Sequence, residues 1–240
     1  MHKFFGIIPA RAGSSRIKNK NMQLLDGKPL IQHTFEAALN SNNINYTIVS
    51  TDDQNIISFA LKMGINAPFV RPDSLAQDDS LVVDAVNHAL KWHQEEFTSL
   101  PDYFILLAPT SPFRDSIDID NAIQKILDSD KDSLVSVCPV TQHPAECVAI
   151  GNNGKLEFIE IDGLDLRQGT QNYKEYFFID SSICICKTSV FFDHYLKLGI
   201  LYDKDSDPFI MEKSHCIDIN DMYDLKQARA MSKQSEIINA

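Results

Sequence analysis

Short apolar runs alternate with helix-patterned segments along the first 140 residues of the chain. These runs are apolar on both faces, which is typical of strands in a parallel sheet that carries helices on each side. The sequence therefore predicts an α/β fold, with a Rossmann-like, mostly parallel sheet flanked by helices. The predicted strands are 3–9, 46–50, 67–70, 103–108 and 133–140.

Local signals set the ends of the predicted helices. Pro29 stands at a first helical turn, where its missing N–H costs nothing. The next helix follows Asp52 and Asp53 and stops at Gly64, which can adopt the left-handed conformation of a C-cap. A third helix has one apolar face at helical spacing, formed by Val82, Val86, Ala89 and His93.

The alternation of strands and helices stops near residue 140. Two alternating runs are joined there by the turn sequence GNNG (151–154), which predicts a β-hairpin. We therefore expect a small arm at 141–178, which departs from a core made of residues 1–140 and 179–240.

The chain has a formal net charge of -11, which argues against a nucleic acid or a membrane surface as a partner. The loop Pro9–Met22 nevertheless has no acidic residue and four basic ones: Arg11, Arg16, Lys18 and Lys20. Because it follows the first strand, the loop lies at the carboxyl edge of the sheet, where open α/β folds bind ligands. Its small residues let backbone N–H groups approach an anion closely. We expect a small, highly charged anion as the ligand; the alternative is a solvated basic loop.

Neither membrane insertion nor secretion is indicated by the sequence. No apolar run approaches the roughly 18 residues of a membrane span, and the start MHKFFGIIPAR is too short for a signal peptide. The cysteines form no Cys-x-x-Cys motif, so we expect free thiols in a reducing cytoplasm. They are Cys138, Cys147, Cys184, Cys186 and Cys216.

A resemblance to a known family is carried by sequence blocks that follow one another along the chain. They are IIPARAGSSRIKNKN (7–21), VSTDD (49–53), VRPDSLAQDDS (70–80), VDAVNHAL (83–90), LLAPTSPFR (106–114) and HCIDINDMYDLKQA (215–228). Together they resemble the acylneuraminate cytidylyltransferases, which are synthetases of CMP-sialic acid and other CMP-nonulosonates. The resemblance implies transfer of CMP from CTP to a nonulosonic acid, a nine-carbon α-keto acid sugar, with release of pyrophosphate. It also implies Mg²⁺ as the cofactor and a homodimer.

The resemblance assigns a set of residues to the nucleotide. They are Ala10, Arg11, Ser14, Arg16, Lys20, Asn21, Arg71 and Ser80. Arg11 and Lys20 are implied as catalytic, because phosphate charge must be neutralised while pyrophosphate leaves. From the residues alone, Arg71 could instead form a salt bridge and Ser80 could cap the following helix. Lys18 has only a weak functional case.

A strand predicted at 215–219 brings the candidate metal ligands to the same edge of the sheet. Asp218 is the expected Mg²⁺ ligand and the third catalytic residue, because Mg²⁺ takes one or two carboxylates together with phosphate oxygens. The family usually has Asp-x-Asp here, whereas this chain has Asn220, whose amide oxygen can bind a metal without neutralising charge. Asp221 is a further candidate ligand, although a role as N-cap of the last helix is favoured.

The sugar side departs from the family in two places. Members that use sialic acid commonly have Gln-Pro-Thr-Ser-Pro, and Ala108 replaces that glutamine here; an Asn-Gly pair becomes Asp180-Ser181. Since buried polar groups discriminate strongly when a partner is missing, we expect a sugar other than N-acetylneuraminic acid, such as legionaminic or pseudaminic acid. The expected sugar-binding residues are Ala108, Thr110, Ser111, Arg167 and Asp180.

Residues 141–178 correspond to the arm with which members of the family dimerise. Arg167, which precedes Gln168, is expected to bind the sugar carboxylate in the neighbouring subunit; the alternative is a solvent-exposed arginine. His143, on the same arm, is expected to be structural.

Two other functions fit parts of the pattern. A GT-A glycosyltransferase also has a Rossmann-like sheet and a DxD metal motif, but that motif follows a central strand, and LLAPTSPFR has none there. A nucleotide-binding homologue without catalysis is left open by Asn220 and Ala108, although Arg11, Arg16 and Lys20 argue for catalysis.

Overall fold

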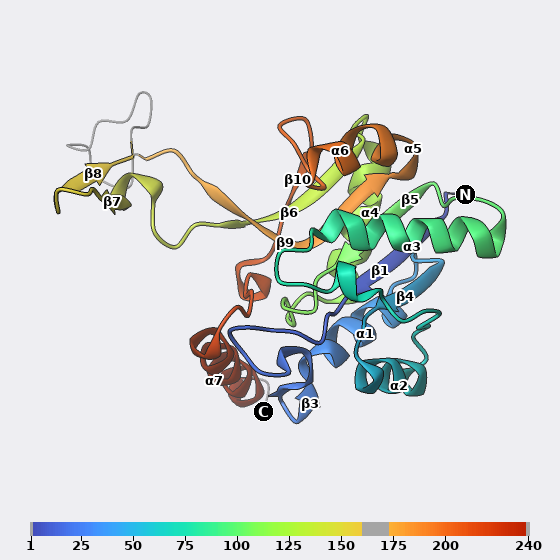
Figure 1. Ribbon diagram of the computed structural model, residues 1–240. Coiled ribbons are helices and arrows are strands. Elements are labelled where there is room, and N and C mark those ends of the chain that lie inside the picture. The colour runs from blue at the N-terminus through green and yellow to red at the C-terminus, as the bar shows by residue number, and fades with distance from the viewer. Residues whose placement is uncertain (1, 160–172, 239–240) are drawn as a thin grey trace.

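The computed structural model describes residues 2–159 and 173–238, and it confirms the predicted α/β architecture (Figure 1). The strands of its central sheet are β1 (Phe4–Pro9), β4 (Tyr46–Ser50), β5 (Tyr103–Leu107), β6 (Ser133–Pro139), β9 (Phe177–Lys187) and β10 (Asp207–Ile210). Within the described residues their order is β10-β6-β9-β5-β1-β4. The sheet is mostly parallel, because only β9 runs antiparallel to its neighbours β5 and β6.

Helices cover both faces of this sheet. On one face lie α1 (Leu30–Asn40), α2 (Gln54–Met63) and α4 (Ser116–Asp128), and on the other lies α3 (Val82–Phe97). The last helix, α7 (Met222–Ile238), lies beside the basic loop rather than on the sheet (Figure 1). Across the two described stretches, no helix is both long and apolar enough to span a bilayer.

Several short elements connect these parts. They are β2 (Leu24–Leu25), β3 (Lys28–Pro29), α5 (Thr188–Val190), a π-helical turn (Phe191–Tyr195), α6 (Leu196–Leu198), and 3-10 turns at Lys20–Met22, Asp73–Leu75, Pro144–Glu146 and Lys213–His215.

The predicted helix boundaries are confirmed in detail. The Asp53 side chain caps α2 by accepting a hydrogen bond from the Asn55 N–H at 2.8 Å, and Gly64 ends the helix with a φ of 89°. Pro29 immediately precedes the first residue of α1. The predicted apolar face of α3 is shifted at its start, because Val83 is buried there and Val82 is exposed.

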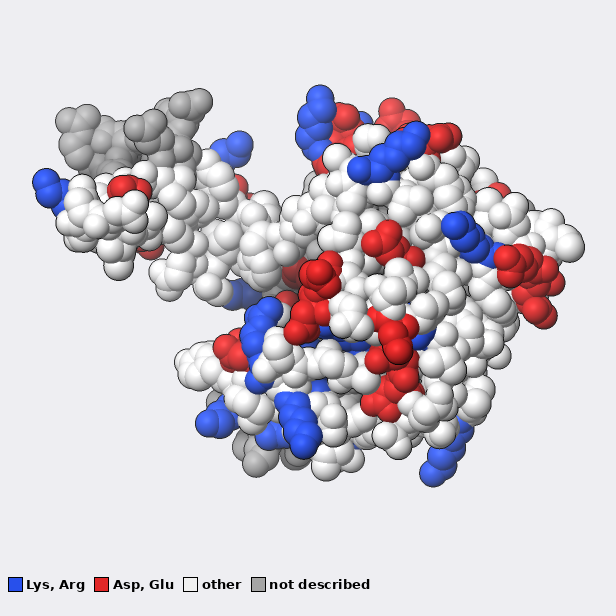
Figure 2. All heavy atoms as spheres, in the orientation of Figure 1, with Lys and Arg blue, Asp and Glu red and all other residues white. Residues whose placement is uncertain are grey.

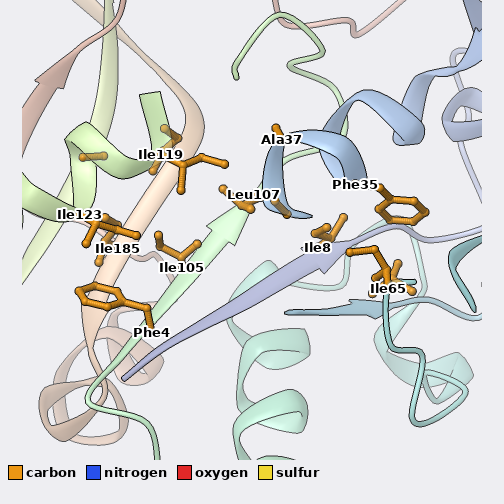
Figure 3. Close-up of a cluster of buried hydrophobic side chains, with 14 of the residues drawn as sticks. Phe4, Ile8, Phe35, Ala37, Ile65, Ile105, Leu107, Ile119, Ile123 and Ile185 are labelled. Carbon is orange, nitrogen blue, oxygen red and sulfur yellow. The ribbon is translucent and has the colours of Figure 1, made fainter. Parts of the chain in front are cut away.

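The core explains why the first strand is apolar throughout. Phe4 and Ile8 of β1 pack on the side of α1 and α4 (Figure 3), whereas Phe5 and Ile7 pack on the side of α3. Alternate strand residues point to opposite faces, so a strand covered on both sides needs apolar residues at every position.

Two predicted strands are wrong. Residues 67–70 form no strand; Pro68 lacks the N–H that a ladder requires, and only the preceding Asn66 makes a bridge to β4. Residues 215–219 form no strand either, because His215 ends a 3-10 turn and 216–219 are irregular. The sheet edge is instead β10, which was missed because it is short, alternates in burial and contains Pro208.

The predicted hairpin is present as β7 (Val148–Ile150) and β8 (Leu156–Phe158), which pair antiparallel. It stands away from the central sheet (Figure 1) and exposes the apolar side chains of Val148, Ile150, Leu156 and Phe158. Ile150 is the most exposed of these four side chains, at 77%. Exposed apolar surface of this kind marks an interaction site.

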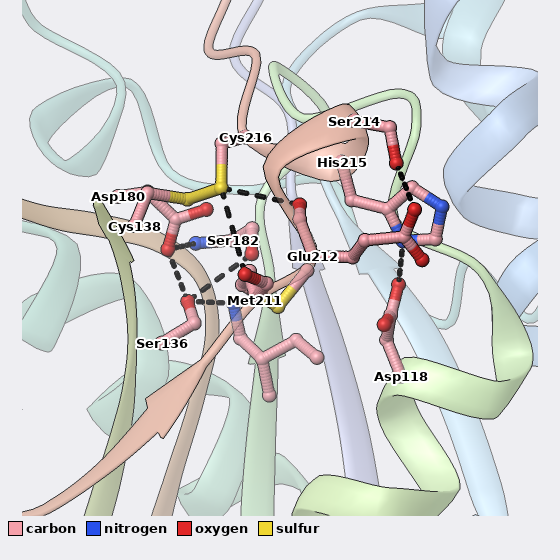
Figure 4. Close-up of a disulfide and its surroundings, with 11 residues drawn as sticks. Asp118, Ser136, Cys138, Asp180, Ser182, Met211, Glu212, Ser214, His215 and Cys216 are labelled. Carbon is pink, nitrogen blue, oxygen red and sulfur yellow. Dashed lines mark hydrogen bonds and ion pairs between the residues drawn. A yellow bond between two sulfur atoms is a disulfide. The ribbon is translucent and has the colours of Figure 1, made fainter. Parts of the chain in front are cut away.

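The expectation of free thiols is wrong for two of the five cysteines. Cys138, at the carboxyl end of β6, forms a disulfide with Cys216, 78 residues further along the chain (Figure 4). The pairing arises because β10 runs parallel to β6 and its continuation stays beside it, with the Met211 N–H bonded to the Val137 carbonyl at 2.9 Å. The remaining three thiols are free, as predicted: Cys147, Cys184 and Cys186.

This disulfide predicts a thiol count. Unfolded, unreduced protein should titrate three thiols, and reduced protein should titrate five. Reduction should lower the free energy of unfolding by about 2–4 kcal/mol, because the bond closes a long loop. Cys138→Ser should reproduce that loss, whereas Cys147→Ser, which removes an exposed thiol, should be neutral. Five titratable thiols before reduction would contradict the disulfide.

Candidate active site

Three segments from distant parts of the sequence meet at one edge of the sheet. The basic loop leaves the carboxyl end of β1, the turn 108–112 leaves β5, and residues 216–220 lead into α7. The Lys20 ammonium donates a hydrogen bond to the Ile219 carbonyl at 3.1 Å, and the Ile219 N–H donates to the Thr110 carbonyl at 2.8 Å. The structure therefore brings together the phosphate, metal and sugar segments that the sequence predicts.

The basic loop is held by its own backbone and by one apolar residue. The Ala10 N–H donates to the Ser50 carbonyl, and the Ala12 N–H donates to the Asp52 carboxylate at 2.8 Å. Ile17 is buried in a small cluster with Ile219 and with apolar residues of α7. Figure 2 shows Lys and Arg side chains on the lower part of the molecule, where Figure 1 places the basic loop and α7. The loop therefore has a defined conformation, anchored by these hydrogen bonds and by Ile17.

The candidate nucleotide-binding side chains of this loop and the neighbouring Lys18 differ in burial. Ser14 and Arg11 are partly buried, whereas Arg16 and Lys18 are exposed. Arg11 forms an ion pair with Asp78 at 2.7 Å, and its carbonyl accepts a hydrogen bond from the Asn21 amide at 3.3 Å. An exposed ion pair of this kind contributes little and can be exchanged for a phosphate.

Lys20 is the most constrained of the loop cations. Burial lowers its pKa, the carboxylate of Asp218 opposes that shift, and the like charges of Arg16 and Arg11 add to it. A bound polyanion would relieve both unfavourable effects, because its charge stabilises the ammonium. The environment of Lys20 is therefore suited to phosphate.

The candidate metal ligands lie directly beside Lys20. The Asn220 amide donates a hydrogen bond to the Asp218 carboxylate at 2.6 Å, which leaves the amide oxygen of Asn220 and the second oxygen of Asp218 for another ligand. One carboxylate and one carbonyl oxygen form a donor set that Mg²⁺ accepts, with phosphate oxygens and water completing it. The residues present therefore fit a magnesium ion.

Asp221 has a different task. Its carboxylate accepts hydrogen bonds from the N–H groups of Tyr223 at 2.7 Å and Asp224 at 3.1 Å, while Asp224 accepts from the Asp221 N–H at 2.9 Å. This reciprocal arrangement is a capping box at the start of α7. The N-cap role favoured by the sequence is confirmed.

A second acidic group lies close by without matching the predicted ligands. Atoms of Asp115, Asp118 and His215 lie within 4.8 Å of one another. Asp115 and Asp118 form the capping box of α4, and the His215 ring bonds to Asp118 at 2.6 Å. Their hydrogen bonds explain this cluster without a metal.

A cavity of about 190 Å³ opens next to the basic loop. Its lining includes Pro9, Arg11, Arg71, Gln77, Ser80 and Ala85. Arg71 is buried and donates through Nε to the Ser50 hydroxyl at 3.1 Å and through Nη2 to the Ser50 carbonyl. Burial lowers the pKa of Arg71 to about 10, while Asp52 opposes the shift.

The alternatives for these two cavity residues are wrong. No carboxylate of the described residues forms an ion pair with Arg71. The helix α3 is preceded by Leu81 rather than capped by Ser80, whose hydroxyl accepts from the Gln77 N–H at 3.0 Å and donates to the Ser74 carbonyl at 3.2 Å.

The predicted sugar-binding residues differ from one another in burial. Ala108 and Thr110 are partly exposed, whereas Ser111 is buried and its hydroxyl has no hydrogen-bond partner among the described residues. Asp180 is also buried, and its carboxylate accepts from the Ser136 hydroxyl and from the Ser182 N–H (Figure 4). Arg167, like Gln168, lies outside the described residues.

Asp180 and Ser181 form part of a bulge where β9 pairs with β6. Ser181 has a φ of 53°, a left-handed conformation that favours glycine. This backbone requirement accounts for the glycine that the family resemblance places here. His143, as expected, is structural: its ring accepts from the Ala145 N–H at 3.2 Å.

Sequence reasoning missed Arg114, the last residue of the block LLAPTSPFR. Its side chain is 1% exposed and donates to the carbonyls of Ala108 and Ser182. Burial lowers its pKa to about 10, and the charges of Asp118 and Asp180 oppose that shift. The signal available in the sequence was an arginine directly before Asp115, the N-cap of α4.

A family model described as Cytidylyltransferase matches residues 5–237, nearly the whole chain. The chain belongs to this cytidylyltransferase family. The solved structure of a CMP:2-keto-3-deoxy-manno-octonic acid synthetase in complex with CTP has the same fold, with a TM-score of 0.71 and 18% identity over 97% of this chain and 99% of that one.

Two relatives have clear sequence similarity to this chain. The chain is 40% identical over 154 residues to the CMP-N,N'-diacetyllegionaminic acid synthase of Legionella pneumophila, covering 64% of this chain and 66% of that protein. It is 31% identical over 227 residues to the N-acylneuraminate cytidylyltransferase of Escherichia coli, covering 94% of this chain and 51% of that protein. The matches therefore span less than two thirds of each relative.

The geometry of the site predicts that Lys20 dominates the affinity of the protein for CTP. Lys20→Ala should weaken CTP binding about tenfold or more, because it removes a partly buried, charge-assisted hydrogen bond. Isothermal titration calorimetry with CTP and Mg²⁺ measures this. Lys18→Ala is the matched control, since Lys18 is an exposed lysine of the same loop and should change affinity by less than about threefold. Equal losses of CTP affinity in the two variants would mean that the loop acts only as a general basic surface.

Proposed function

We propose that the protein transfers the cytidylyl group of CTP to a nonulosonic acid and releases pyrophosphate. The observation that carries this proposal is the contact of Lys20 with Ile219, which puts the basic loop beside Asp218. A triphosphate and its metal ion can thereby be bound between them, with the adjoining cavity available for the base.

The chemistry needs positioning and charge neutralisation more than a protein nucleophile. The sugar's anomeric hydroxyl attacks the α-phosphorus in line, and pyrophosphate leaves on the opposite side. Arg11, Arg16 and Lys20 neutralise the phosphate oxygens, with the small side chain of Ser14 leaving room for them. A magnesium ion bound by Asp218 and the Asn220 amide oxygen would withdraw charge from the phosphates and acidify the attacking hydroxyl.

Base selection is assigned to the cavity beside the loop. Arg71 is fixed there by two hydrogen bonds to Ser50, and Ser80 by its bonds in the loop before α3. A guanidinium held in this way discriminates bases better than a flexible one, because a mismatched base leaves its remaining N–H groups unpaired. We propose that this rigid pocket favours cytosine over a purine.

The proposed sugar is a nonulosonic acid other than N-acetylneuraminic acid, and the legionaminic acid type is the first candidate. Ala108 removes the amide that the family resemblance places next to sialic acid, and the relative with the highest identity quoted above is named for a legionaminic acid. Thr110 and Ala108 are partly exposed at the site, while Asp180 shapes the bulge behind them.

We propose that two copies of the chain assemble through the arm, residues 141–178, and that Arg167 of one copy reaches the sugar carboxylate of the other. The exposed apolar side chains of β7 and β8 support this, because they need a partner surface. A sedimentation mass of 27.1 kDa would contradict the dimer. We place the enzyme in the cytoplasm, where CTP is available.

The two alternative functions have less support. The family match covers cytidylyltransferases rather than glycosyltransferases. A homologue without catalysis would have no reason to keep Lys20 and Asp218 in one electrostatic environment, as they are here.

The proposed activity is tested by pyrophosphate release. With CTP, Mg²⁺ and either legionaminic, pseudaminic or N-acetylneuraminic acid, turnover should be highest with a sugar other than N-acetylneuraminic acid. Replacing CTP by ATP should reduce turnover at least about tenfold, since the pocket selects the base. No pyrophosphate with any of the three sugars would overturn the proposed function. A preference for N-acetylneuraminic acid would overturn only the choice of sugar.

A further inference from the structure

Arg114 occupies a junction that neither the proposed mechanism nor core packing explains. It lies between the turn 108–112 and the start of α4, and its side chain is among the largest that are fully buried. Its Nε and Nη2 atoms find no hydrogen-bond partner among the described residues. A buried cation with unpaired donors stabilises a fold less than an apolar residue of similar volume would. A reason other than packing is therefore needed.

The Nη1 atom of Arg114 joins the two strands that lead to the sugar side. It donates to the Ala108 carbonyl at 3.4 Å and to the Ser182 carbonyl at 3.1 Å. These carbonyls belong to the turn after β5 and to the bulge of β9, which lie next to each other because the Ala108 N–H also bonds to Ser182. One guanidinium thus fixes the spacing of the turn and the bulge.

The charge of Arg114 also reaches the metal segment. Asp118 of α4 is the strongest opposite charge acting on it, and Asp118 bonds to the His215 ring at 2.6 Å (Figure 4). His215 stands three residues before Asp218, at the end of a 3-10 turn. Arg114 and Asp118 are thus bonded to the turn after β5, to the bulge of β9 and to His215, and no hydrogen bond or ion pair of the described residues joins them to the basic loop.

We propose that Arg114 is a positioning residue, which holds the turn 108–112 and the bulge at 180–182 in the geometry that receives the acceptor sugar. This inference rests on the proposed function and extends it, because it assigns a buried residue to the sugar rather than to CTP. In the proposed function the triphosphate binds at the basic loop, to which Arg114 makes no hydrogen bond among the described residues.

The test compares the KM for the sugar with the KM for CTP in variants of Arg114. Arg114→Met keeps much of the volume and removes the charge and the hydrogen bonds. It should raise the sugar KM about tenfold and leave the CTP KM within about twofold, because the sugar side loses its geometry while the basic loop keeps its own hydrogen bonds to Ser50 and Asp52. Arg114→Lys retains one cation that can reach a carbonyl, and it should raise the sugar KM by only about threefold.

A matched control excludes a merely structural role. Ile123→Ala, a buried apolar truncation on α4, the helix that follows Arg114, should lower the melting temperature while leaving both KM values unchanged. Loss of folded protein lowers kcat but cannot alter the KM of one substrate alone. If Arg114→Met does not fold, Arg114→Lys carries the same comparison.

The outcomes are distinct. A folded Arg114 variant with an unchanged sugar KM, or with equal rises in both KM values, would overturn the positioning role. Absence of turnover by the wild-type protein would instead overturn the proposed function.

Discussion

The two backbone hydrogen bonds of Ile219 connect the parts on which the site depends. Its N–H donates to Thr110 and its carbonyl accepts from Lys20, while its side chain is fully buried against Ile17 and Leu25. Ile219 thus fixes the relative positions of the basic loop, the turn 108–112 and the segment that leads into α7. Asp218 and Asn220 flank Ile219, so the same contacts that anchor it also position the candidate metal ligands.

The electrostatics follow from this geometry. The chain is acidic as a whole, with a formal net charge of -11, yet Lys20 is partly buried among Arg16, Arg11 and Asp218. Burial disfavours its ammonium form and lowers its pKa, and a polyanion bound against it would stabilise that form. The protein therefore places positive charge where it is unfavourable without a ligand, and binding of the ligand removes the cost.

Much of the fold could be predicted, because its signals are local. The apolar run of β1, the Asp53 and Gly64 caps and the hairpin turn each depend on neighbouring residues only. The edge strand β10 could not be predicted, since Pro208 and alternate exposure hide it. The Cys138–Cys216 pair was missed for a different reason: cysteine spacing carries no information on contacts formed by sheet order.

The site shows the same division. Sequence motifs gave Lys20, Asp218 and the turn after β5 as candidates, but not the contacts through Ile219 that bring them together. Asp221 could be assigned as a cap because a capping box is local. The role of Arg114 could not, since its partners Ala108, Ser182 and Asp118 come from three separate elements.

The central claim is that Lys20 and Asp218 act on one bound triphosphate as a unit. A double-mutant cycle on kcat/KM, with Lys20→Ala, Asp218→Asn and the double variant, tests it most directly. We expect each single substitution to cost about 10²-fold or more, and the double variant to cost far less than the product of the two, because residues that act together are not additive. Costs that multiply would mean that the two residues act independently, and would contradict a shared site.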